Sequence, residues 1–217
     1  GLAYDAGTGR LYYTTYTGKA KLYFYDGTNQ IYTGQLDLEV ADADFYEGNY
    51  YFIAGGGAGG TDDLYEVSFN PDGTILAVIS HGSITGDMHR WTFGGDIAIS
   101  PDGLFYAWGS CSIDGKYEFF TVNHDGTGFT LIASGIYSRS QQLAFGKDGK
   151  LYGHDAQLST GPFYEINTTT GVPTFLANQP QGKTFTDLAS EPLCVPIIIQ
   201  ETAWGAGTAF PGKNWAT

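Results

Sequence analysis

The side chains best suited to chemistry gather in a few irregular segments of the chain. Residues 88–91, Met-His-Arg-Trp, combine the single Met with a His, an Arg and a Trp. An exposed Trp beside an Arg suits contact with a sugar or a peptide. The structural alternative, which we favour, is that Trp91 fills a gap between two structural units while Arg90 pairs with a carboxylate. His89, Arg90 and Trp91 are therefore candidate ligand-binding residues.

His154 and Asp155 are a second candidate, since a His oriented by an acid can act as a base. Adjacent residues on a strand point to opposite faces, however, so we expect these side chains not to touch. Arg139 completes the candidate ligand-binding set. All these residues fall in irregular segments that we expect on one face of the fold, at 55–63, 81–95, 110–115, 135–141 and 154–161. Binding residues concentrate on loops held by a rigid scaffold, so this loop-rich face is the predicted binding face.

Carboxylates recur at the start of one repeated strand. The equivalent positions are Gly1, Ala43 or Asp44, Asp96, Gln142 and Asp187. Acids converging on one axis would repel, and a bound Ca²⁺ would relieve this because it favours several oxygen ligands. Asp96, Gln142 and Asp187 are thus candidate metal ligands, and solvated acids are the alternative. No other cofactor is expected.

Several sequence motifs that would indicate a specific catalytic or ligand-binding site are missing. The Gly-rich segment 55–60 lacks the Lys-Ser/Thr of a phosphate loop, and neither a G-x-S-x-G elbow nor an H-E-x-x-H zinc pair occurs. Residues 123–128 partly resemble a calcium loop but lack its later acid, so we expect a turn there. The two cysteines, Cys111 and Cys194, allow one disulfide; whether it forms depends on how the C-terminal tail folds.

One unit of four short strands recurs along the chain. Aligning Leu22, Leu64, Tyr117 and Phe163 gives spacings of 42, 53 and 46 residues. Turns rich in Asp and Gly separate alternating strands, which predicts antiparallel pairing. Units of this length are typical of β-propeller blades. The predicted all-β fold has four four-stranded blades and an incomplete fifth. We place the blades at 1–40, 41–86, 87–139 and 140–183, a fifth inner strand at 186–190 and a non-repeat tail at 191–217.

The turns SPDG (100–103), NPDG (70–73) and GKDG (146–149), with their flanking LA or IA and LYY or LFY strands, resemble those of TolB-like and YVTN-like propellers. The resemblance covers residues 1–190 and implies an architecture that many functions share. The tail at 201–217 resembles segments near the C-termini of secreted bacterial proteins of unknown role.

Four units and one further strand do not close a propeller ring, and the ring could be completed in three ways. Residues 194–203 could add strands to a fifth blade, the chain could be part of a larger propeller, or another chain could complete the open edge. If the tail mediates assembly, its apolar residues are the candidates: Ile197, Ile198, Ile199, Trp204, Phe210 and Trp215.

The composition narrows the class of partner. The net charge of −13, with only 10 Lys and Arg, disfavours binding to nucleic acid or to anionic membranes, and no apolar run could span a bilayer. Few Lys and many Thr, Tyr and Gly suggest a secreted or cell-surface protein. We therefore expect a non-enzymatic binding or structural module for a protein or glycan, with possible self-assembly into an oligomer or filament. The alternative is a Ca²⁺-assisted lyase or hydrolase.

Overall fold

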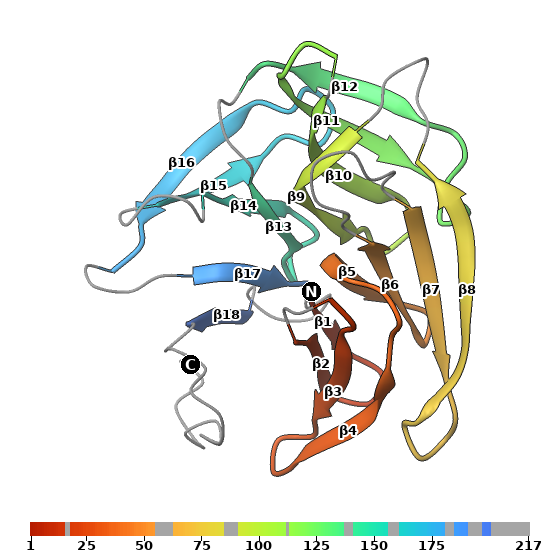
Figure 1. Ribbon diagram of the computed structural model, residues 1–217. Coiled ribbons are helices and arrows are strands. Elements are labelled where there is room, and N and C mark those ends of the chain that lie inside the picture. The colour runs from red at the N-terminus through yellow and green to blue at the C-terminus, as the bar shows by residue number, and fades with distance from the viewer. Residues whose placement is uncertain are drawn as a thin grey trace.

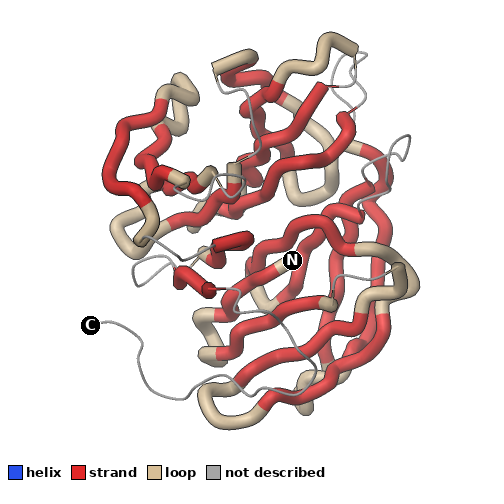
Figure 2. Tube along the Cα trace, turned by 60° about the vertical axis from the view of Figure 1, so that its left-hand side comes forward, coloured by secondary structure: helices blue, strands red, loops and turns tan. Residues whose placement is uncertain are grey.

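The fold consists of β-strands. The computed structural model describes residues 1–15, 18–54, 63–84, 91–111, 113–136, 141–155, 161–180, 185–190 and 197–200. Every regular element in these ranges is a strand, drawn in red in Figure 2. The strands form four four-stranded sheets and one two-stranded sheet, which radiate from a common centre (Figure 1). This confirms the predicted propeller of four complete blades and an incomplete fifth.

Each blade follows the chain outward from the centre, and neighbouring strands pair antiparallel. The first blade contains β1 (Leu2–Asp5), β2 (Arg10–Thr14), β3 (Lys21–Tyr25) and β4 (Gln30–Gln35). The second contains β5 (Val40–Tyr46), β6 (Asn49–Ala54), β7 (Asp63–Phe69) and β8 (Ile75–Ser83). The third contains β9 (Trp91–Ile99), β10 (Phe105–Cys111), β11 (Tyr117–Val122) and β12 (Thr130–Ser134). The fourth contains β13 (Gln142–Phe145), β14 (Leu151–His154), β15 (Pro162–Ile166) and β16 (Pro173–Asn178).

The fifth blade has two described strands, β17 (Phe185–Ala189) and β18 (Ile197–Gln200). They pair antiparallel with Leu188 opposite Ile198. Part of the tail therefore adds a strand to the fifth blade, as the first of the three ways of closing the ring expects. The described residues contain no helix long and apolar enough to cross a membrane.

The inner strands close a ring. β1, β5, β9, β13 and β17 each pack against the inner strand of the next blade, and β17 packs against β1 (Figure 1). Residues at the start of these strands therefore surround one end of the propeller axis. A radial blade also has an outer edge, which β4, β8, β12 and β16 form in the complete blades.

Aromatic side chains fill the spaces between blades. Tyr12 of the first blade stacks on Phe45 of the second, with ring centroids 5.1 Å apart. Trp108 and Phe119 of the third blade pack with Leu143 of the fourth. Such ring pairs stabilise a fold by about 0.5–1.5 kcal/mol beyond the area they bury. The high aromatic content is thus used for packing between sheets.

The Asp-Gly turns close the outer hairpins as expected. In the turn after β7, the Asp72 side chain accepts hydrogen bonds from the backbone N–H and the hydroxyl of Thr74, at 2.9 and 2.7 Å. Gly73 has φ of 88°, which a residue with a Cβ rarely adopts. Asp125 and Thr127 repeat both contacts in the third blade. The repeat in the sequence therefore corresponds to a turn with the same hydrogen bonds in different blades.

Candidate functional site

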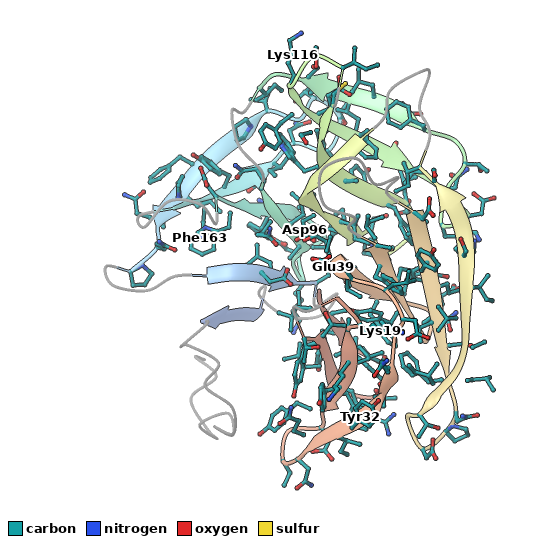
Figure 3. All side chains as sticks on the ribbon, in the orientation of Figure 1. Lys19, Tyr32, Glu39, Asp96, Lys116 and Phe163 are labelled. Carbon is teal, nitrogen blue, oxygen red and sulfur yellow. The ribbon has the colours of Figure 1, made fainter. Side chains whose placement is uncertain are left out.

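Carboxylates from several inner strands surround the propeller axis. Asp42 and Asp44 lie on β5, Asp96 on β9 and Asp187 on β17. We call these four residues the axial carboxylates; Figure 3 shows Asp96 near the centre of the ring. Asp42, Asp44 and Asp96 are buried, and the Asp187 side chain is 22 % exposed. Asp187 is therefore the member best placed to meet a ligand from solvent.

Hydrogen bonds to neighbouring blades hold two of these side chains. Asp96 accepts the backbone N–H of Leu143 on β13 at 2.8 Å, and Asp44 accepts that of Ile99 on β9 at 2.7 Å. An inner strand has another strand of its own sheet on one side only, so its second edge presents unpaired N–H groups. A carboxylate from the preceding blade satisfies one such group. These acids thus help to fix the angle between successive blades.

Ser190 joins strands on different sides of the axis. Its hydroxyl donates to Asp44 at 2.7 Å and accepts the backbone N–H of Phe145 at 3.0 Å. The second, fourth and fifth blades therefore meet in one buried hydrogen-bond network. Because Asp44 and Ser190 are 146 residues apart, this contact forms only when the ring closes.

The shared environment makes these acids hold protons strongly. Burial raises the pKa of Asp96 well above its usual value, and the charges of Asp42 and Asp187 raise it further. Burial also raises the pKa of Asp44 to about 7, against hydrogen bonds from Ile99, Ser190 and Phe45 that lower it. Ionising all four axial carboxylates therefore costs free energy, and a bound cation would reduce that cost.

Gln142 and Asp187 complete the predicted metal-binding set. Gln142 begins β13 and is buried opposite His154 of β14. Asp187 accepts the backbone N–H of Leu188 at 2.9 Å, and its other oxygen lies 3.8 Å from the nitrogen of Gly1. All candidate donors are oxygens, and hard oxygen ligands are what Ca²⁺ prefers. The types of donor therefore suit calcium.

Asp42 belongs to this group, although the repeat in the sequence indicated only Ala43 or Asp44 at that position. Ala43 packs with Ala3 and Tyr12 in the core between the first two blades. Asp42 and Asp44 point to the other side of β5, because alternate residues of a strand share a face. The Asp-Ala-Asp alternation at 42–44 could have identified both acids.

His154 faces a packed interior. Its ring is fully buried and stacks on Phe163 with centroids 4.3 Å apart. Its Nδ1 lies 3.3 Å from the carbonyl oxygen of Pro162, and the backbone N–H of Asp155 donates to that same oxygen. This environment suits a structural His better than a solvent-exposed base.

The other predicted residues lie largely beyond the part of the chain that the structure describes. His89, Arg90, Arg139, Cys194, Trp204, Phe210 and Trp215 fall outside the described residues. Trp91 begins β9, and Ile197, Ile198 and Ile199 lie in β18, with only their backbones described. Cys111 is buried at the end of β10. Ligand binding by the loop-rich face and the disulfide therefore stay predictions.

The outer strands form a second candidate surface. Large apolar side chains are exposed on β8, β12 and β16: Leu76, Val78, Ile79, Leu131, Phe175 and Leu176. None of β4, β8, β12 and β16 contains an Asp, Glu, Lys or Arg, although the chain has 33 such residues (10 + 23). Charged side chains are a common protection of exposed sheet edges against pairing with other chains. These edges lack that protection.

Comparisons with known proteins agree on the fold. No family model matches the chain, and no curated protein matches it. Solved structures do. TolB from Acinetobacter baumannii is 12% identical with a TM-score of 0.55, covering 84% of this chain and 44% of that one. The calcium-binding protein regucalcin from Agrobacterium tumefaciens is 12% identical with a TM-score of 0.52, covering 92% of this chain and 66% of that one. The PQQ-bound aldose sugar dehydrogenase from Streptomyces coelicolor is 13% identical with a TM-score of 0.59, covering 92% and 80%.

The structural similarity therefore confirms the TolB-like propeller architecture that the turn motifs implied. At these identities it establishes the fold alone, and the matched proteins include an enzyme as well as a calcium-binding protein.

Proposed function

We propose that this chain is a non-enzymatic, secreted or cell-surface propeller that assembles with further copies of itself through its outer strands. The observation that carries the proposal is the absence of charged residues from all four outer strands of a chain with a net charge of −13. The small number of Lys residues supports an extracellular location. The proposal explains why exposed apolar side chains concentrate at the blade edges.

The strand β8 is the best contact surface for a second copy. It is the longest outer strand, with nine residues, and it exposes Leu76, Val78 and Ile79. Antiparallel pairing of β8 with β8 of a second copy would satisfy backbone groups at both edges. Such a contact is self-complementary and has twofold symmetry, which closes a dimer.

Replacing Val78 and Ile79 together by Lys is expected to convert a dimeric or larger particle into a monomer. Both side chains are exposed, so the blade tolerates the change, but the twofold contact then brings like charges together. We expect the dissociation constant to rise roughly a hundredfold, equivalent to about 3 kcal/mol. Sedimentation equilibrium over a range of concentrations measures it. Thr28→Lys, which adds charge at an exposed turn, is the control.

Two results would reject assembly through β8: a monomeric wild-type protein at high concentration, or an unchanged mass for the double variant. Assembly through the tail makes a different prediction, because deletion of residues 196–217 would then abolish the larger particle. A particle that survives this deletion and dissociates in the double variant supports the outer strand.

The axial carboxylates favour a second candidate, a Ca²⁺-assisted lyase or hydrolase. Its support is the position of Asp42, Asp96 and Asp187 on inner strands around one axis, where burial and then the charges of Asp42 and Asp187 raise the pKa of Asp96. A bound Ca²⁺ would lie among these side chains and Gln142, where it could stabilise developing negative charge on a substrate oxygen. His154 is packed on Phe163, so acid–base steps would fall to the carboxylates themselves.

Calcium is expected to stabilise the wild-type protein and to bind less tightly as the pH falls. Protons compete for Asp96, whose pKa is raised. Asp187→Asn should weaken binding at least roughly tenfold, as measured by isothermal titration calorimetry. Asp37→Asn, at an exposed ion pair with Lys19, removes the same charge elsewhere and should leave binding unchanged. Equal affinities in the two variants would remove this candidate.

A further inference from the structure

Three metal-ligating side chains meet in the hairpin between β10 and β11. The Cys111 sulfur, one Asp114 oxygen and one Glu118 oxygen all lie within 4.8 Å of one another. Cys111 and Glu118 are buried, at 1 % and 3 % exposure, whereas Asp114 is exposed. Figure 3 shows Lys116, from the same hairpin, at the periphery of the propeller and Asp96 near its centre. This hairpin cluster is thus separate from the axial carboxylates.

The strand register brings the thiol and the buried carboxylate together. Glu118 pairs with Gly109, and Cys111 lies two residues beyond Gly109 on the same strand. Alternate residues of a strand share a face, so Cys111 and Glu118 point to the same side of the blade. Gly109 has no side chain to separate them.

The turn then places Asp114 over this pair. The N–H of Cys111 donates to the carbonyl of Lys116 at 2.7 Å, and that of Gly115 donates to the carbonyl of Cys111 at 2.9 Å. Asp114 accepts the backbone N–H of Lys116 at 3.0 Å. The backbone of the hairpin therefore holds its three ligating residues near one another without a metal.

Lys116 supplies a positive charge to the same cluster. Its Nζ lies 2.8 Å from the second oxygen of Asp114. The hydrogen bond to Asp114, followed by the charges of Asp114, Glu118 and Cys111, raises the pKa of Lys116. The Lys116 side chain is 58% exposed. Exposed ion pairs contribute little, so a divalent cation can displace this ammonium from Asp114 at small cost.

We propose that Cys111, Asp114 and Glu118 form a binding site for a zinc-class divalent cation. A thiolate with two carboxylates matches the ligands that Zn²⁺ accepts, with the sulfur selecting against Ca²⁺ and Mg²⁺. Ligand atoms of a tetrahedral zinc site lie about 3.5 Å apart. On binding, the three ligand atoms approach one another from within 4.8 Å to that spacing, and water takes the fourth position.

Titration of the reduced, chelator-treated full chain with Co²⁺ tests the site. We expect a thiolate-to-cobalt absorption band that Zn²⁺ abolishes by displacement. Cys111→Ser should eliminate the band. Glu118→Gln should weaken Co²⁺ binding at least roughly tenfold, because even the loss of a residue that only hydrogen-bonds to a metal ligand has an effect of this size. Lys116→Gln should strengthen binding, because it removes the competing ammonium.

Matched variants make the result specific. Cys194→Ser removes the other thiol, and Asp37→Asn removes a distant surface charge; both should keep the band. The proposal is wrong if the wild-type protein gives no band, or if the band survives in Cys111→Ser. It is also wrong if Lys116→Gln binds Co²⁺ no better than the wild type. That result would mean that the Lys116 ammonium does not compete with the metal ion for Asp114.

Discussion

The free energy of unfolding is expected to fall by a few kcal/mol as the pH rises from 4 to 8. Asp44 has a pKa of about 7 in the folded protein, against 3.8 as its ordinary value. A group whose pKa is raised by folding stabilises the folded state fully below the unfolded value, and this contribution is lost as the pH rises through the folded value. A difference of about three units corresponds to about 4 kcal/mol.

The opposite trend is confined to a lower pH range. Hydrogen bonds lower the pKa of exposed turn acids such as Asp72 and Asp125 below 3.8. Their stabilising contribution is present above that value and is lost only as the pH falls further. Maximal stability is therefore expected on the acidic side of neutrality, where Asp44 is protonated and the turn acids are still charged.

Asp44→Asn isolates the contribution of this one group. The amide cannot titrate, so the dependence of stability on pH between 5 and 8 should flatten, even if one hydrogen bond to the amide is poor. Denaturant unfolding in chelator at several pH values measures the slope. Asp37→Asn removes the same formal negative charge at an exposed pair with Lys19 and should keep the wild-type slope. Equal slopes for Asp44→Asn and Asp37→Asn would contradict the assignment to Asp44.

The sequence was sufficient to predict the blades because their information is local. Leu22, Leu64 and Phe163 lie at equivalent places in β3, β7 and β15, each directly before a shift in the strand register. In β11 this place belongs to Phe119, two residues after the predicted Tyr117. The Asp-Gly turns are formed within four residues. Each of these features depends on neighbours along the chain, which a single sequence displays.

The candidate site depends on contacts between distant segments, and these were predicted less completely. Position in the repeat predicted that Asp96 and Asp187 lie near one axis. It did not predict that Asp96 accepts the backbone N–H of Leu143 in the next blade. The bond from Ser190 to Asp44 spans 146 residues and requires the closed ring. The hairpin cluster of Cys111, Asp114 and Glu118 was missed because its members look like separate turn and strand residues.

Gly95→Ala is expected to be the most destabilising single substitution near the axis. A Cβ at Gly95 would lie 1.5 Å from the carbonyl oxygen of Trp108 and 2.4 Å from its carbonyl carbon. The obstacle is backbone of the paired strand β10, which cannot move aside as a side chain would. β9 and β10 would have to separate where their register already shifts, between Trp108 and Ser110.

The consequence reaches the axial carboxylates because Asp96 follows Gly95 directly. Displacing β9 would misplace Asp96 relative to Leu143 and disturb the Trp108 core between the third and fourth blades. We expect a loss of roughly 4–5 kcal/mol, a large share of the stability of an ordinary domain. Denaturant midpoints measure the loss, and a low yield of folded protein has the same meaning.

Gly18→Ala is the control, because nothing lies within 4 Å of its Cβ position. There the added methyl restricts the unfolded chain, so the protein should be unchanged or more stable by about 0.4–1 kcal/mol. Similar midpoints for the two variants would show that β9 and β10 do not approach each other closely at Gly95. A large difference would instead show that the close approach of β9 and β10 at Gly95 holds these two strands together. The same contact would then determine the position of Asp96 near the axis.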